Sequence, residues 1–172
     1  MSTRAERYAH RIEAQAEALF RRIVLAPPGS WHRREPGGWS PSVTVAHICE
    51  FLPYWSSRLA VLASNPGSSW GRPEDDPDRL AGIEPGALLE PPAACERLHR
   101  VAAAASAAIR ALPEAALDVP LRHVSGDPAL GTLEALIDRA LCSHLEAHHA
   151  QLRRLLARPP SPTPVAPPRV EG

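Results

Sequence analysis

Apolar residues recur every three or four positions in four long stretches of this sequence, and segments rich in proline and glycine separate the stretches. This spacing places the apolar side chains on one face of an α-helix. The four stretches span residues 3–25, 40–64, 93–112 and 132–158, and no run of alternating β-branched residues is present. The pattern predicts an all-α protein, a four-helix bundle whose first and middle connections are long.

Local signals indicate where two of these helices begin and where one is weakened. Ser40 and Pro41 are typical of an N-cap followed by the first helical residue, because proline has the required φ angle and needs no donor there. Thr132 can cap a fourth helix that extends to about residue 158. Pro53 removes a backbone hydrogen bond inside the second stretch, so we expect a kink or an early end near Leu52.

Two proline-rich segments lie outside the expected helices. Residues 65–92 contain six prolines, four glycines and an acidic run without a sustained period, so we expect a long loop. Residues 159–172 contain six more prolines and cannot bury enough apolar surface to fold. The sequence therefore predicts one bundle domain over residues 1–158 and a disordered, proline-rich tail over residues 159–172.

Charge and residue usage exclude several classes of function. All 19 basic residues are arginine, which excludes a Schiff-base lysine, a PLP lysine and the lysine of a phosphate-binding P-loop. The 19 acidic residues cancel this charge and no basic block is present, so we expect no nucleic-acid partner. Three widely spaced cysteines suit a reducing cytoplasm. Because no apolar run is long enough for a signal peptide or a membrane span, we expect a cytoplasmic protein without membrane association.

Three of the eight histidines form a candidate metal site. His144 and His148 are four residues apart, so they point the same way from one helix and interrupt its apolar face. Such a pair suits a metal, although a solvated face or a hydrogen-bonded core pair has the same spacing. His47 on the second helix can supply a third neutral ligand and leave coordination positions open. Glu50, three residues later, is a candidate catalytic proton carrier or a hydrogen-bond acceptor beside the ligands, and equally a surface carboxylate.

Two short motifs carry a family resemblance. Residues 38–50 read GWSPSVTVAHICE, and residues 144–152 read HLEAHHAQL. An entry like Trp-Ser-Pro before a first metal His, followed on the last helix by His-x-x-x-His-x-x-Gln, resembles the DinB-like superfamily of bacterial four-helix proteins. The family's ligand positions correspond to His47, His144 and His148, and Gln151 completes the second motif. The resemblance covers residues 2–158, although Pro53 and the tail depart from the family pattern.

The resemblance implies a DinB-like bundle that binds a divalent metal, Zn or Ni, through three histidines, and frequently a homodimer. Members of known activity resemble S-transferases that use bacillithiol, mycothiol or another low-molecular-weight thiol, and a related group isomerises maleylpyruvate with mycothiol. The expected partners are therefore a small-molecule thiol and an electrophile. A metal with neutral ligands would favour the thiolate of such a thiol, whose ordinary pKa is about 8.5.

Aromatic residues and arginines are the remaining candidates for a binding pocket. We expect Trp55 and Trp70 to form pocket walls, with Trp70 packing back from its long connection to cover the metal. Arg33, Arg34 or Arg58 could bind a carboxylate of the thiol cofactor. Three alternatives to a transferase stay open: a metal-dependent hydrolase, a non-catalytic metal- or ligand-binding stress-response dimer, and a structural protein whose core histidines are only hydrogen-bonded.

Overall fold

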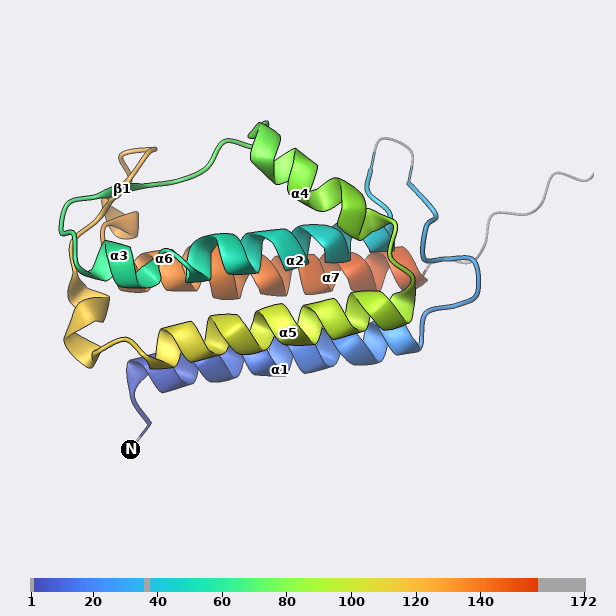
Figure 1. Ribbon diagram of the computed structural model, residues 1–172, viewed down its shortest axis with the longest axis horizontal. Coiled ribbons are helices and arrows are strands. Elements are labelled where there is room, and N and C mark those ends of the chain that lie inside the picture. Colours follow the sequence, from blue (N-terminus) through green and yellow to red (C-terminus); the bar gives the residue numbers. More distant parts are fainter. Residues whose placement is uncertain (1, 36–37, 158–172) are drawn as a thin grey trace, which may run out of the picture.

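Four long helices form the body of the protein in the computed structural model, which describes residues 2–35 and 38–157. These helices are α1 (Arg4–Val24), α2 (Pro41–Ser56), α5 (Pro91–Arg110) and α7 (His144–Ala157). α1 lies beside α5 and α2 lies beside α7, while contacts of α2 with α5 and of α1 with α7 close the bundle (Figure 1). The predicted all-α class is confirmed, whereas the predicted tail lies outside the described residues.

The apolar faces of these helices meet along the centre of the bundle. The largest fully buried side chains are Ile12, Leu19, Ile23, Ile48, Leu52, Leu59, Leu98, Ile109, Leu117, Leu133, Leu136 and Ile137. Burial of one such side chain stabilises the fold by about 1.5–3 kcal/mol. Ala9 and Ala105 are also fully buried, and their small side chains allow α1 and α5 to approach closely. No helix in the described part of the chain is both long and apolar enough to cross a membrane.

The second helix begins as predicted but ends later than expected. The Ser40 side chain accepts a hydrogen bond from the backbone N–H of Val43, and Pro41 is the first helical residue. α2 does not end near Leu52, because Pro53 lies within the last turn and only one of its backbone hydrogen bonds is lost. The helix continues to Ser56, and α3 (Leu59–Ala63) follows directly.

The last helical stretch is not a single α-helix. The Thr132 side chain accepts from the backbone N–H of Ala135 and begins α6 (Leu133–Leu136). A π-helix, η3 (Ile137–Ser143), then precedes α7. A π-helix closes its hydrogen bonds over five residues instead of four, and such segments are frequent at functional sites.

The expected loop over residues 65–92 contains two regular elements. Asp76 accepts from the backbone N–H of Arg79 and caps α4 (Pro77–Ala87), so the loop prediction is wrong for these residues. A segment that contains β1 (Ser69–Trp70) runs back along the bundle before α4, and α4 packs on α2 (Figure 1). This connection forms a cover over one side of α2.

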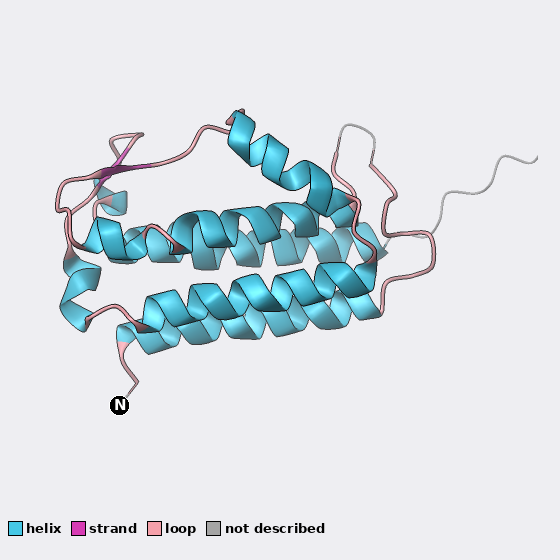
Figure 2. Ribbon diagram, in the orientation of Figure 1, coloured by secondary structure: helices cyan, strands magenta, loops and turns pink. Residues whose placement is uncertain are grey.

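A second connection meets the cover at one end of the bundle. It contains the 3₁₀ segments η1 (Glu114–Asp118) and η2 (Pro128–Leu130), with β2 (Arg122–His123) between them. β1 and β2 pair in parallel as the two-stranded sheet drawn in Figure 2. This pairing joins two loops that are far apart in the sequence.

Candidate metal centre

Three imidazole rings from α2 and α7 converge in the bundle. The Nε2 atom of His47 lies 3.2 Å from Nε2 of His144, which lies 2.8 Å from Nε2 of His148. One ring nitrogen of each histidine lies within 4.8 Å of the others. Nitrogen ligands about 2.05 Å from a metal are separated by about 3.3 Å in a tetrahedral site and about 2.9 Å in an octahedral one. The separations of His47 from His144 and of His144 from His148 are close to these values, as expected for ligands of a shared divalent cation.

The surroundings of the outer nitrogen in two of the rings indicate which nitrogen can bind a metal. Nδ1 of His148 lies 2.8 Å from Oε1 of Gln151, an acceptor, so the His148 proton is assigned to Nδ1 and the Nε2 lone pair faces the centre. Nδ1 of His47 lies 3.9 Å from Oε2 of Glu50, and neither atom has a hydrogen-bond partner in the described part of the chain. A proton on this Nδ1 would likewise leave the inward Nε2 as an acceptor.

Burial keeps the three rings neutral. Burial is the main cause that lowers the pKa of His47 to about 2 and that of His144 to about 4, and repulsion from His148 contributes to both values. Burial also lowers the pKa of His148, against an opposing hydrogen bond to Gln151. Neutral imidazole nitrogens are ligands that Zn and Ni accept readily. The donor chemistry thus fits the cation that the sequence predicts, while the assignment of the three ligands stays a prediction.

Aromatic side chains fix the orientation of the cluster. The Trp39 ring stacks on His148 at 5.9 Å with an interplanar angle of 9°, and the Phe51 ring stacks on His144 at 4.4 Å and 21°. His47 contacts the edge of Trp39 at 5.1 Å. These contacts restrict ring rotation, so the inward nitrogens are held in place before any ligand binds.

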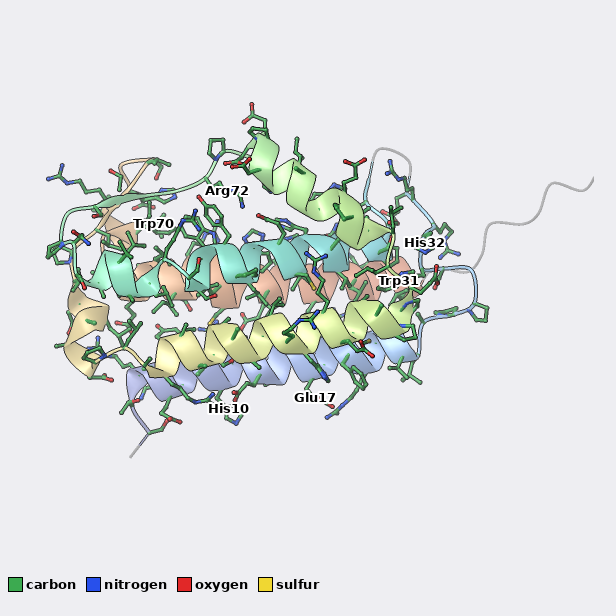
Figure 3. The ribbon with its side chains drawn as sticks, viewed as in Figure 1. His10, Glu17, Trp31, His32, Trp70 and Arg72 are labelled. Atoms are coloured by element: carbon green, nitrogen blue, oxygen red, sulfur yellow. The ribbon has the colours of Figure 1, made fainter. Side chains whose placement is uncertain are left out.

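Glu50 is held by an arginine that the sequence did not single out. Nη1 of Arg72 donates to Oε1 of Glu50 at 2.5 Å, and Nη2 donates to Asp76 at 3.1 Å. The Arg72 guanidinium also lies 3.8 Å above the Tyr54 ring. In Figure 3, Arg72 and Trp70 extend from the cover toward α2. The second Glu50 oxygen faces His47, which favours a positioning role, and the predicted catalytic role of Glu50 stays untested.

A cavity of about 600 Å³ adjoins the cluster and borders on His47 and His144. Trp55 and Trp70 lie in its lining, and their predicted role in binding a cofactor stays a prediction. The Trp70 side chain is 5% exposed and donates through Nε1 to the backbone oxygen of Leu130. The cavity therefore lies between the histidine cluster and the two joined connections.

Arg58 does not reach this cavity. Its guanidinium lies 3.6 Å above the Tyr54 ring and donates to the Tyr54 backbone oxygen. The arginines that do line the cavity are Arg72 and Arg79 on the cover and Arg139 on the π-helix. Sequence reasoning missed them because their approach depends on α4 and η3. An Asp76–Pro77 pair, typical of a helix N-terminus, was the available signal for α4.

Comparisons with known proteins are consistent with this architecture. The family model of the DinB superfamily matches residues 10–158. The solved structure of YfiT from Bacillus subtilis, described as a probable metal-dependent hydrolase with an unusual four-helix bundle topology, has a TM-score of 0.68 and 16% identity. That similarity covers 88% of this chain and 85% of the other.

A mycothiol-dependent maleylpyruvate isomerase is similar with a TM-score of 0.65 and 16% identity over 88% of this chain. This chain spans 63% of the isomerase, less than two thirds of its length. At 16% identity these two similarities establish a shared fold. No curated protein sequence matches the chain significantly.

Proposed function

The chain belongs to the DinB superfamily, and on that premise we propose that it is a metal-dependent S-transferase. Its His47, His144 and His148 would hold a divalent cation, Zn or Ni, and its second substrate would be a low-molecular-weight thiol. The observation that carries the proposal is the convergence of three neutral imidazoles beside a cavity of about 600 Å³. A bound cation would lower the pKa of a thiol so that the thiolate predominates near neutral pH.

The residues around the cluster have separate roles in this proposal. Gln151 and Glu50 orient His148 and His47 from their outer edges, and Arg72 fixes Glu50. Trp55 and Trp70 provide apolar walls against which the body of the electrophile can pack and from which water is excluded. The described dependence of the similar isomerase on mycothiol supports a thiol as the co-substrate.

A second candidate function is metal-dependent hydrolysis, in which water would take the place of the thiol. It is favoured by the described activity of YfiT, which matches this chain over 85% of its own length. Both functions use the same cluster and cavity. They differ in the nucleophile that the cavity admits.

Several finer expectations remain proposals of the same kind. We propose residues 1–158 as a single domain, and a homodimer in the cytoplasm as the working form. The three cysteines are buried, and burial raises the pKa of Cys49 and of Cys142 to about 12. They are therefore poor nucleophiles, and the reacting thiol must come from a small molecule.

The decisive experiment combines thiols, an electrophile and metal control. Purified protein is loaded with Zn or Ni and incubated with 1-chloro-2,4-dinitrobenzene and, in turn, bacillithiol, mycothiol or glutathione. We expect turnover that requires both the metal and one thiol and that is lost after chelation and in His148→Ala. Metal-dependent cleavage of p-nitrophenyl acetate without a thiol would identify a hydrolase instead. No turnover of either kind by protein that retains metal would favour the non-catalytic binding protein.

A further inference from the structure

Three arginines line the cavity, and they differ in the ion pairs that their guanidinium groups make. Arg72 is bound on both sides, by Glu50 and by Asp76. Arg79 donates through Nη1 to the backbone oxygen of Glu74 at 2.5 Å, and its guanidinium makes no ion pair with any residue in the described ranges. Arg139 makes neither a hydrogen bond nor an ion pair through its side chain within residues 2–35 and 38–157. Two of the three guanidinium groups are therefore available to a ligand.

The two available arginines come from different elements beside the histidine cluster. Arg79 lies on α4, in the cover, and Arg139 lies on the π-helix that leads into His144. Both line the same cavity as His47 and His144, which places both beside the centre. The Glu74 hydrogen bond fixes one edge of the Arg79 guanidinium and leaves other N–H groups for the cavity.

The charge of the cavity lining is not balanced. Glu50 cancels Arg72 through their ion pair, and Glu74 is the second carboxylate of the lining. Among the lining residues alone, Arg79 and Arg139 against Glu74 leave an excess of one positive charge, and Asp76, which also pairs with Arg72, lies outside the lining. A single excess charge matches one carboxylate better than a doubly charged phosphate. An arginine fork also binds a carboxylate in a bidentate manner.

We propose that Arg79 and Arg139 form a carboxylate-binding subsite, and that one reactant is a small molecule with an apolar or aromatic body and a carboxylate end. Its body packs against Phe51, Trp55 and Trp70 while its carboxylate reaches the two guanidinium groups. The assignment of this molecule as a reactant rests on the proposed function. The subsite itself does not, because neither Arg79 nor Arg139 belongs to the histidine cluster. The carboxylate belongs either to the electrophile or to the thiol.

Two pairs of probes separate these sources by titration calorimetry on the full-length protein. Benzoate and benzamide represent the electrophile, and 3-mercaptopropionate and 3-mercapto-1-propanol represent the thiol. Each member of a pair has nearly the same shape, so the ratio of dissociation constants measures the contribution of the carboxylate. The ratio is measured with and without metal in the wild type, Arg79→Gln, Arg139→Gln and the control Arg122→Gln. Arg122 is an exposed arginine of β2 that does not line the cavity.

We expect the wild type to prefer the charged member of at least one pair about tenfold, since a charge-assisted hydrogen bond contributes about that much. Either Arg→Gln variant at the subsite should reduce the preference to about twofold or less, while Arg122→Gln retains it. The pair that shows the effect identifies the source of the carboxylate. A wild type without preference, or a preference unchanged in both subsite variants, would overturn the proposal.

Two further measurements distinguish the subsite from carboxylate binding to the metal and from phosphate binding. A preference that vanishes on metal removal but survives both arginine substitutions would place the carboxylate on the metal and overturn the subsite. Inorganic phosphate that binds as tightly as benzoate, with the same dependence on Arg79 and Arg139, would overturn the assignment to carboxylates. Metal content is measured in parallel. If the protein binds no metal, the proposed metal centre fails, but the ratio of benzoate to benzamide affinity in the metal-free protein still tests the arginine subsite.

Discussion

The two helix pairs of the bundle differ in the polar side chains that they bury. The interface of α1 and α5 is built from side chains such as Ile12, Leu98 and Ile109, which are fully buried. Its buried hydroxyl, Ser106, donates to a backbone oxygen of α1. The interface of α2 and α7 instead contains three imidazoles, and the buried side-chain atoms without partners in the described ranges all lie beside it. These atoms are Nδ1 of His47, Oε2 of Glu50 and Nε of Arg72.

The contrast separates the part of the molecule that stabilises the fold from the part that is prepared for a ligand. A buried polar atom without a partner costs about 1–3 kcal/mol, so a chain retains such atoms where a bound group satisfies them. The α1 and α5 pair has no such cost and supplies stability to the other half. Substitutions in the two pairs should therefore affect different measurements.

The largest effect is expected for metal affinity on replacing His144 with alanine. Loss of one of three ligands should weaken binding by more than about 100-fold, because even the partners of ligands contribute 10- to 100-fold. Metal content after dialysis and competition with a chromophoric chelator measure the change. His149→Ala is the matched control, since its Nδ1 contacts Gln15 on α1 and it lies outside the cluster. Full metal retention by His144→Ala would remove it from the ligand set.

Leu98→Ala should show the opposite behaviour in the α1 and α5 pair. The side chain is 0% exposed, so its truncation should lower the free energy of unfolding by about 3–5 kcal/mol through lost burial and a cavity. Urea denaturation measures the loss, with Leu88→Ala, at a residue 77% exposed, as the control. The folded variant should bind metal with unchanged stoichiometry. Loss of metal from folded Leu98→Ala would show that the two halves are not independent.

Arg72→Gln tests the buried ion pair on the ligand side. The side chains of Arg72 and Glu50 are 7% and 9% exposed, so removal of one charge leaves the other buried without a partner. We expect a loss of about 3 kcal/mol in the free energy of unfolding. The double variant Arg72→Gln/Glu50→Gln should recover much of this loss, because neither charge remains. Additive losses in the double variant would mean that the pair is not coupled.

Acid should destabilise the metal-free protein through the same histidines. Burial lowers the pKa of His144 to about 4, whereas the unfolded chain titrates near 6.5, so the unfolded state binds more protons between these values. Stability must therefore fall as pH falls through this window, by up to about 1.4 kcal/mol per pH unit for each such histidine. Urea denaturation of chelator-treated protein from pH 7 to 5 measures the slope.

Two substitutions make this pH dependence specific to the cluster. His144→Gln should reduce the slope by about one proton, since it removes one neutral buried imidazole. His10→Gln, on the exposed face of α1, should leave the slope unchanged. An equal slope in all three proteins would assign the acid sensitivity to other groups.

The same contrast explains how much could be predicted from the sequence. The α1 and α5 helices follow from apolar periodicity alone, because their pairing buries one continuous stripe from each. The convergence of the three histidines is predicted in two steps: His144 and His148 interrupt the apolar face of one helix, and His47 is added from its place on the second helix and the family motif. These features depend on the spacing of residues within a single helix, which can be read from the sequence.

The cover and the arginines were not predictable in the same way. Gly82 and Gly86 read as loop signals, yet each lies where a Cβ atom would crowd α2: 2.8 Å from Cγ of Glu50 and 3.0 Å from Cβ of Ala46. These glycines permit close packing of α4 against α2. In the sequence, glycines required for such packing look the same as glycines that interrupt a helix. The π-helix has no periodic signature, and Arg139 reaches the cavity only through it.

The smallest effect is expected for Arg110→Gln, on the outer surface of the α1 and α5 pair. Arg110 makes two hydrogen bonds to Glu13, at 2.6 and 2.8 Å, which lie between the 2.5 and 3.1 Å hydrogen bonds of Arg72 in length. Its side chain is 36% exposed and that of Glu13 is 42% exposed, so water and salt screen the pair in both the native and the variant protein. We expect a urea midpoint within experimental error of the wild type, at low and at high salt, and unchanged metal content. A loss as large as that of Arg72→Gln would mean that short contacts rather than burial set the contribution of an ion pair in this protein.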